Sequence, residues 1–126
     1  MYVRDAMSTE VLVIGPTHTL RQAAKLMAHR RVGAAVVNDS EMAGPGILTE
    51  RDILLALAAD KNPDAEQACD HLTSELVHAS PDWTLVQAAA AMLKGGFRHL
   101  VVTDAGGVTG VLSVRDVVRL WTQERS

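Results

Sequence analysis

Two short motifs carry the side chains with the clearest chemical potential. They are Thr49-x-x-Asp52 and Ser113-x-x-Asp116, and each follows a glycine and two aliphatic residues. If each motif begins a helix, the free backbone N–H groups and the helix dipole attract a phosphate, to which the hydroxyl can also donate. An ionised aspartate only accepts hydrogen bonds and suits the vicinal hydroxyls of a ribose, and the glycine lets the backbone approach a flat ring. These groups together describe a nucleoside phosphate site.

The same spacing also has a purely structural interpretation. A hydroxyl residue followed three positions later by an acid is a signature of a helix N-cap and its capping box. On this interpretation the hydroxyls and acids of both motifs do no more than start helices. Both interpretations stay open on the motifs alone.

The two motifs belong to an internal duplication. At an offset of 65 residues, Pro16 meets Pro81 and the stretch 19–27 ("TLRQAAKLM") meets 84–92 ("TLVQAAAAM"). One extra loop residue in the first copy reduces the offset to 64 at the final motif. The order of the matches is kept throughout, which a chance resemblance would not do.

Each copy predicts the same elements in the order strand, helix, strand, strand, helix. Capping-box pairs, Thr19 with Gln22 and Thr84 with Gln87, precede the first helix of each copy. In the first copy we expect strands at 11–15, 33–38 and 46–48, with helices near 20–30 and after Thr49. In the second copy we expect strands at 76–80, 99–103 and 110–112, with helices near 85–94 and after Ser113.

The expected fold class is therefore α/β (α+β), with two β-α-β-β-α repeats packed as a pseudo-twofold pair. We place the first repeat at 1–60, a linker at 61–68 and the second repeat at 69–126, with a short helix at 65–72. Neither repeat is long enough to bury a sheet face well alone, so we expect one merged globular module.

Composition excludes several classes of protein. The net charge of −3 provides no general basic surface, which argues against nucleic acid as a partner. No apolar run is long enough to cross a membrane. Cys69 is the only cysteine, so no internal disulfide forms, and the N-terminus has no apolar signal core. We expect a cytoplasmic protein.

The sequence gives little support for an enzyme. The five histidines are scattered and show no metal-ligand spacing. The duplicated acids Asp52 and Asp116 lie in separate repeats among neutral neighbours, so no tuned acid–base pair is indicated. We therefore expect no catalytic residue, no metal site and no cofactor.

The pattern Gly-hydrophobic-x-Thr/Ser-x-x-Asp, occurring twice behind these helices, resembles a tandem pair of CBS (cystathionine β-synthase) domains from about Val3 to Trp121. The resemblance implies a stand-alone regulatory module that binds AMP, ADP, ATP or S-adenosylmethionine in clefts between its repeats. It also implies a sensor of energy or metabolite state that usually forms a homodimer. Because no effector domain accompanies the repeats, we expect signalling in trans to an unidentified effector protein, with self-association or simple ligand sequestration as the other outputs. The alternative is a ligand-free dimerising interaction or scaffold domain.

The resemblance also assigns roles to the motif residues. It places Asp52 and Asp116 at ribose hydroxyls, and Thr49 and Ser113 at phosphates. An adenine nucleotide is then a regulatory ligand and not a cofactor.

Further positions follow from the same resemblance. Arg98 and His99 would pair with phosphate oxygens in the second repeat, whereas Gly33 and Ala34 stand at those positions in the first. The hydrophobic candidates for the adenine slot are Val13, Ile47 and Val111. Core packing explains each of those three at least as well.

Overall fold

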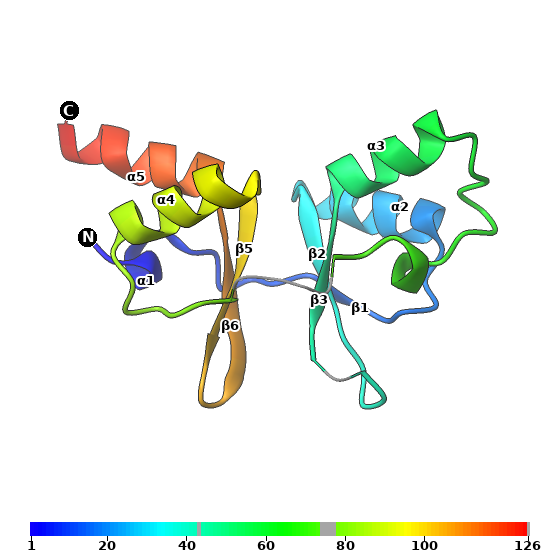
Figure 1. Ribbon diagram of the computed structural model, residues 1–126, viewed down its shortest axis with the longest axis horizontal. Helices are drawn as coiled ribbons and strands as arrows, with labels where there is room; N and C mark the ends of the chain where they lie inside the picture. The colour runs from blue at the N-terminus through cyan, green and yellow to red at the C-terminus, as the bar shows by residue number, and fades with distance from the viewer. Residues whose placement is uncertain (43, 74–77, 126) are drawn as a thin grey trace. The chain divides into compact units, whose positions relative to one another are not determined.

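The computed structural model describes residues 1–42, 44–73 and 78–125, with side chains up to residue 123. The chain divides into two compact units. One unit is Leu12–Leu76, and the other joins Met1–Val11 to Val77–Ser126. Each unit is a small three-stranded sheet with helices packed against it (Figure 1).

The unit Leu12–Leu76 has the predicted order of elements. It contains β1 (Val13–Ile14), α2 (Leu20–Arg30), β2 (Ala34–Val37), β3 (Gly46–Thr49), α3 (Glu50–Ala58) and the 3₁₀ helix η1 (Ala68–Asp70). The strand order is β1-β2-β3, with β1 parallel and β3 antiparallel to β2. The short helix expected at 65–72 is the single 3₁₀ turn of η1.

The second unit repeats this arrangement and confirms the mixed α+β fold. It contains α1 (Val3–Ala6), β4 (His78–Ala79), α4 (Leu85–Gly95), β5 (His99–Asp104), β6 (Gly107–Ser113) and α5 (Val114–Arg125). Its sheet has the order β4-β5-β6, again with one parallel and one antiparallel pair. Residues 76 and 77 of the strand expected at 76–80 lie outside the described residues. The hairpin between β5 and β6 is longer than predicted, because pairing continues past an irregularity at Val102/Thr103.

The duplication is visible in the packing of the two hydrophobic cores. In the unit Leu12–Leu76, α2 packs Leu20, Ala23 and Met27 against Ala35, Val37 and Leu48 of the sheet. In the other unit, α4 packs Leu85, Ala88 and Met92 against Leu100, Val102 and Leu112. Each residue of the first set is matched by its repeat partner in the second. The small alanines allow the helix to lie close to the sheet.

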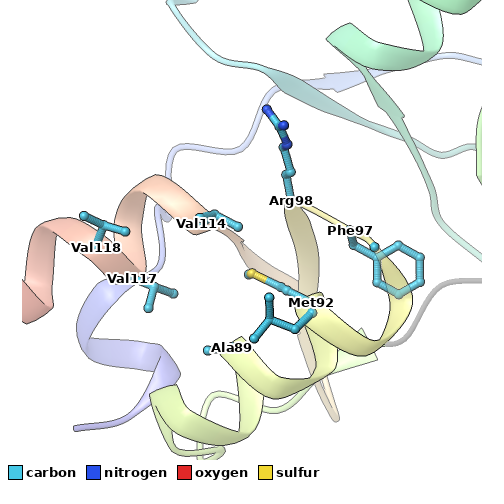
Figure 2. Close-up of a pocket in the computed structure, with 9 residues that line it drawn as sticks. Ala89, Met92, Phe97, Arg98, Val114, Val117 and Val118 are labelled. Atoms are coloured by element: carbon cyan, nitrogen blue, oxygen red, sulfur yellow. The ribbon is translucent and has the colours of Figure 1, made fainter.

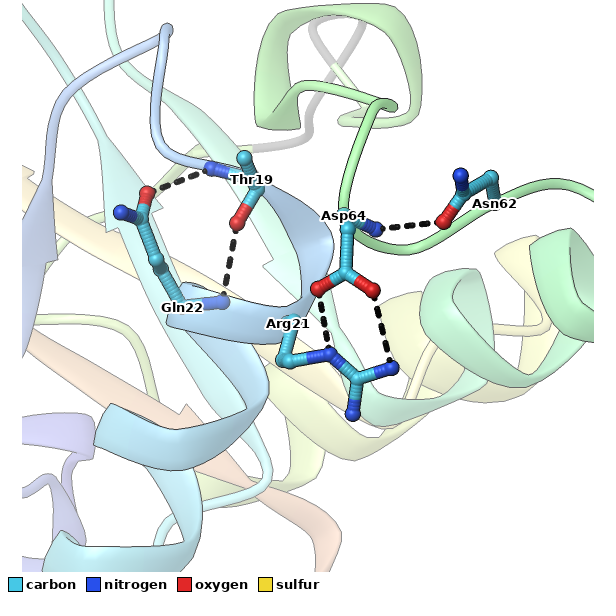
Figure 3. A network of polar contacts seen from close by, with 5 residues as sticks. All are labelled: Thr19, Arg21, Gln22, Asn62 and Asp64. Atoms are coloured by element: carbon cyan, nitrogen blue, oxygen red, sulfur yellow. Dashed lines mark hydrogen bonds and ion pairs between the residues drawn. The ribbon is translucent and has the colours of Figure 1, made fainter.

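Capping boxes fix the starts of α2 and α4, as predicted. The hydroxyl of Thr19 accepts from the N–H of Gln22 at 3.1 Å, and the Gln22 side chain accepts from the N–H of Thr19 at 2.9 Å (Figure 3). Thr84 and Gln87 form the same pair at 3.1 and 2.8 Å. Gly96, at φ 71°, ends α4 in the left-handed conformation that glycine adopts without strain.

An ion pair holds the segment after α3 against the start of α2. The guanidinium of Arg21 donates two hydrogen bonds to the carboxylate of Asp64, whose own N–H donates to Asn62 at 2.9 Å (Figure 3). The hydrogen bond from Arg21 lowers the pKa of the Asp64 carboxyl. Both side chains are exposed, so the contact fixes position more than it adds stability.

The first residues of the chain complete the unit that contains the second repeat. The N–H of Val3 donates to the carbonyl of Trp83 at 2.8 Å. Ser8 pairs with Val111 through two backbone hydrogen bonds of 2.9 and 3.0 Å, along the free edge of β6. Val3 and Ala6 are buried in the same core as α4.

The matching segment of the second repeat makes the same contacts in the first repeat's unit. The N–H of Ala68 donates to the carbonyl of His18 at 2.8 Å, and Thr73 pairs with Ile47 on the edge of β3 at 2.9 and 3.0 Å. Residues 3–8 and 68–73, here called the leading segments, are thus exchanged between the repeats. The boundaries 1–60, 61–68 and 69–126 follow the sequence repeat, whereas the compact units follow this exchange.

The glycine of each motif lies where a leading segment passes closest to the sheet. A Cβ on Gly110 would lie 2.7 Å from the carbonyl oxygen of Ser8 and 2.9 Å from the sulfur of Met7. A Cβ on Gly46 would lie 2.7 Å from a methyl of Leu72 and 3.1 Å from the carbonyl oxygen of Thr73. The sequence suggested that this glycine lets a flat ring come close to the backbone. In the structure it lets a leading segment of the same chain come close.

Replacing Gly110 with alanine should therefore destabilise the protein. Because the nearest atom is a backbone oxygen that cannot rotate away, we expect Gly110→Ala to lower the free energy of unfolding by about 1–3 kcal/mol. Gly46→Ala should cost less, since a leucine methyl can move. Urea denaturation measures both, with Gly44→Ala as the control because nothing lies within 4 Å of that Cβ. Equal stability of the Gly110 and Gly44 variants would contradict the close approach.

Candidate functional site

The first motif lies where β3 ends and α3 begins, in the unit Leu12–Leu76. Thr49 is the N-cap, and its hydroxyl accepts from the N–H of Asp52 at 3.2 Å. Asp52 Oδ2 accepts from both the N–H of Thr49 at 2.8 Å and its hydroxyl at 3.0 Å. Asp52 Oδ1 has no hydrogen-bond partner among the residues that the structure describes. The capping interpretation is therefore realised, and one carboxylate oxygen is left over.

The second motif has the same two capping hydrogen bonds but, among the described contacts, no counterpart of the bond from the Thr49 hydroxyl to Asp52. Asp116 Oδ2 accepts from the N–H of Ser113 at 2.9 Å, and the hydroxyl of Ser113 accepts from the N–H of Asp116 at 3.0 Å. Here the remaining oxygen, Asp116 Oδ1, lies 3.3 Å from Nη2 of Arg119. The two motifs thus differ at the oxygen that a ligand would meet.

Capping alone does not require an acid at these positions. In α2 and α4 the third helical residue is a glutamine, Gln22 or Gln87, and it closes the capping box equally well. An aspartate stands there in α3 and α5, and in the single turn of α1, where Asp5 accepts from the N–H of Tyr2 at 2.8 Å. The acid also complements the helix dipole, but a second lone-pair oxygen at a fixed place is what the glutamine helices lack.

Arg98 and His99 lie at the start of α5, next to the second motif. The carbonyl of Arg98 accepts from the N–H of Val114 at 2.9 Å, and His99 is the register partner of Ser113 across β5 and β6. The Arg98 side chain is exposed. In the first repeat the carbonyl of Gly33 receives the N–H of Glu50 at 2.9 Å, so the same place has no cationic side chain.

The three hydrophobic candidates differ in accessibility. Val13 on β1 is 57% exposed and available to a ligand. Ile47 on β3 is only 3% exposed, which matches the core interpretation of this residue. Val111 on β6 is half-buried and is paired through its backbone to Ser8.

Asp52 also lines a hollow of about 320 Å³ in its own unit. One wall is the face of α3 that carries Asp52, Leu55 and Ala56, together with the C-cap residue Ala59. The other wall comes from the segment that leads to and follows η1, namely Lys61, Asp70, His71 and Leu72. The hollow therefore combines apolar side chains with charged groups of both signs.

A second hollow, of about 440 Å³, lies between α4 and α5. Val114, Val117 and Val118 of α5 face Ala89 and Met92 of α4 across it, and Arg98 stands at its edge (Figure 2). The remaining lining residues are Leu93, Gly96 and Phe97. Arg98 is the only charged residue in this lining.

Sequence reasoning missed two residues near these places. Arg119 pairs with Asp116, and the signal was their i, i+3 spacing on the last helix. The other is His71, whose side chain is only 18% exposed and whose Nε2 lies 3.2 Å from Oε1 of Glu66. No sequence periodicity marked His71, because it lies in an irregular segment.

The described residues contain no group of three or more His, Cys, Asp or Glu side chains that could hold a metal ion. Cys69 is exposed. The pKa of its thiol is raised mainly by local desolvation and, to a smaller extent, by the negative charge of the neighbouring Asp70 carboxylate. Within the described part of the chain, no helix is long and apolar enough to cross a membrane.

Comparison with known proteins shows relatives of the same size and fold. The CBS domain-containing protein YhcV of Bacillus subtilis is 30% identical over 91% of this chain and 81% of its own. The crystal structure of the CBS-domain containing protein ATU1752 from Agrobacterium tumefaciens has a TM-score of 0.88 at 28% identity, over 96% of this chain and 99% of its own. The CBS domain pair of protein MJ0100, solved in complex with 5′-methylthioadenosine and S-adenosyl-L-methionine, has a TM-score of 0.85 at 24% identity, over 96% and 99%.

The family model for the CBS domain matches twice, at residues 3–59 and 68–122. Each match begins at a leading segment and ends in or just after the helix that follows a Thr/Ser-x-x-Asp motif. The sequence repeat, the fold and the relatives agree, and this chain belongs to the CBS domain family as a tandem pair.

Proposed function

We propose that this chain is a regulatory module that binds an adenosine-containing ligand and passes its occupancy to an effector protein in trans. CBS domain pairs are regulatory ligand-binding modules, and we assign no catalytic role to this one. The observation that carries the proposal is the carboxylate of Asp52. One of its oxygens, Oδ2, is fixed by the cap of α3. The other, Oδ1, has no hydrogen-bond partner among the described residues, and the Asp52 side chain lines a hollow.

This geometry suits a ribose. The hydrogen bonds from Thr49 hold the Asp52 side chain in one position, so little side-chain freedom is lost when a ligand binds. A vicinal diol donates hydrogen bonds, and a free carboxylate oxygen accepts them strongly. MJ0100 holds two adenosine compounds on the same fold, so AMP, ADP, ATP and S-adenosylmethionine are the ligands to test first.

The phosphate contacts are unequal between the repeats. The hydroxyl of Thr49 donates to Asp52, so a phosphate would have to compete for it. The second repeat adds Arg98 and His99 beside Ser113, whereas the first has Gly33 and Ala34. We assign phosphate recognition mainly to Arg98, because a guanidinium binds phosphate oxygens through two donors.

We assign the contact with the adenine base mainly to Val13. It is exposed on a short strand and offers an apolar surface for an adenine ring. Val111 can contribute its exposed part. Ile47 is buried, so a contact with the ring would require a local movement.

A second candidate function is a ligand-free scaffold that dimerises. The capping boxes at Thr49 and Ser113 favour it, because they explain both motifs without a ligand. Exposed apolar residues also favour self-association: Leu54, Leu55 and Leu57 of α3, Val86 and Leu93 of α4, and Val114, Val118 and Trp121 of α5. A homodimer built on these helix faces is part of both proposals.

A melting screen against adenosine compounds tests the ligand proposal. A ligand present at a hundred times its dissociation constant stabilises the fold by about 2.7 kcal/mol, which raises the melting temperature by several degrees. We expect this shift with at least one of AMP, ADP, ATP and S-adenosylmethionine. In the double variant Asp52→Ala/Asp116→Ala the shift should disappear.

The control for that experiment is loss of a cap elsewhere. Gln22→Ala removes the matching capping side chain from α2 and should lower stability by a similar amount, about 1 kcal/mol, while leaving the ligand-induced shift intact. Asp52→Asn keeps an oxygen for the cap but removes the charge. If the double variant melts with the same shift as the native chain, the carboxylates do not hold the ligand and the scaffold proposal stands.

Arg98→Ala tests phosphate recognition. Removing the guanidinium should weaken AMP and ATP binding by about tenfold or more, because a hydrogen bond between charged groups is lost. Adenosine, which has no phosphate, should bind nearly as before. Isothermal titration calorimetry measures all three, with Lys94→Ala on the exposed end of α4 as a control for net charge. An equal loss for adenosine would mean that Arg98 does not contact phosphate.

Val118→Glu tests self-association through the helix faces. A charge at this exposed apolar position of α5 should shift the protein toward monomer in light scattering coupled to gel filtration, because the carboxylate would lose its water in the interface. Ser40→Glu, an exposed loop position, adds the same charge and should leave the mass unchanged. A native chain that is already monomeric at high concentration would remove the dimer from both proposals.

A further inference from the structure

One arginine connects the second candidate carboxylate to the start of the chain. Arg119 Nη2 lies 3.3 Å from Asp116 Oδ1 and donates to the backbone carbonyl of Ala6, also at 3.3 Å. The Asp116 side chain is 16% exposed, and that of Arg119 is 57% exposed. The guanidinium therefore partly covers the carboxylate oxygen that the capping box leaves over.

Among the described residues, the first repeat has no such connection. The residue that matches Arg119 at the repeat offset is Leu55, an exposed apolar residue in the wall of the hollow beside Asp52. Leucine can neither pair with Asp52 nor donate to the matching leading segment. The two motifs are thus alike in their caps and differ in whether the remaining oxygen is occupied.

We propose that Arg119 is an internal competitor for the ligand at Asp116, and that a ligand bound there loosens the end of α1. The inference rests on the proposed function. A ribose hydroxyl that donates to Asp116 Oδ1 takes the place of the Arg119 guanidinium. Because one nitrogen of Arg119 makes both contacts, moving it away from Asp116 also removes its hydrogen bond to Ala6.

The consequence is confined to the end of α1. Val3 and Ala6 stay buried in the core, and the N–H groups of Val3 and Arg4 stay bonded to the carbonyls of Trp83 and Pro81. The Ala6 carbonyl is freed where the chain turns toward Ser8 and continues into the other unit at Leu12. Occupancy at Asp116 thereby acts on the stretch that connects the two units.

Adenosine binding to variants with only the second site tests the competition. In the Asp52→Ala background, Arg119→Leu should tighten adenosine binding about two- to fivefold, the range that an exposed ion pair represents. Adenosine is uncharged, so loss of general attraction for phosphate does not enter. Arg115→Leu is the matched control and should leave the affinity unchanged, because Arg115 is exposed on the same helix and its side chain makes no hydrogen bond or ion pair with Asp116 among the described contacts. Unchanged or weaker binding in Arg119→Leu would overturn the competition.

Failure of the proposed function gives a different result. If Asp52→Ala/Asp116→Ala binds adenosine as well as Asp52→Ala does, Asp116 is not a ligand residue and the site assignment itself fails. If Asp52→Ala does not bind adenosine but Asp52→Ala/Arg119→Leu does, the competition is confirmed in its strongest form. If neither binds while the native chain does, Asp116 holds no ligand and the inference falls, whereas the proposed site at Asp52 stands. Arg119→Gln repeats the test with a polar side chain.

Hydrogen exchange tests the effect on α1. In Asp52→Ala, saturating adenosine should speed amide exchange at Ala6 and Met7, at the end of α1, and leave the bonded amides of Val3, Arg4 and Ser8 unchanged. In the Arg119→Leu variant exchange there should already be fast, and adenosine should not increase it further. Slower or unchanged exchange in Asp52→Ala with adenosine bound would overturn the link between Asp116 and α1.

Discussion

The backbone pairing of each leading segment with the edge of a sheet is the interaction on which both candidate sites depend. Ser8 pairs with Val111, and Thr73 pairs with Ile47. The strand residue of each pair, Ile47 or Val111, follows the motif glycine directly and stands two residues before the motif hydroxyl. The pairing fixes the last strand of each repeat, and that strand delivers the helix start whose dipole, cap and acid form the site. The glycine is needed because the segment passes too close for a side chain.

On this common frame the two repeats have diverged in complementary ways. The first keeps an uncovered carboxylate oxygen at Asp52 but has Gly33 where a phosphate would need a cation. The second has Arg98 beside the helix start, but the corresponding oxygen of Asp116 faces Arg119. On the proposed function, a nucleoside without phosphate favours the first repeat and a nucleotide gains more from the second.

Much of the fold could be predicted from the sequence, because duplication gives each pattern twice. The helices after Thr19, Thr84, Thr49 and Ser113 begin at their caps as expected, since a hydroxyl followed by Gln or Asp three residues later is a local signal. The exchange of the leading segments could not be predicted. Residues 3–8 are few and have no periodicity of their own, and nothing local distinguishes packing on one repeat from packing on the other.

In the candidate site too, the positions set by local sequence could be predicted and those set by tertiary packing could not. The positions of Asp52, Asp116 and their hydroxyl partners follow from the motif, and Arg98 follows from its place before β5. The burial of Ile47 and the exposure of Val13 depend on tertiary packing and could not be read from two aliphatic residues. Arg119 was visible only as a possible helix pair. Its second contact, to Ala6, joins residues at opposite ends of the chain.

The exchanged segments also bear on how such a chain could arise. A solitary repeat lacks the strip of backbone that seals its sheet edge, and its own first residues are directed elsewhere. A one-repeat ancestor would therefore have had a complete fold only as a dimer in which the two molecules exchange their N-terminal segments. Fusion of those two copies end to end turned an exchange of segments between chains into an exchange within one chain. The residues of each repeat could then change independently.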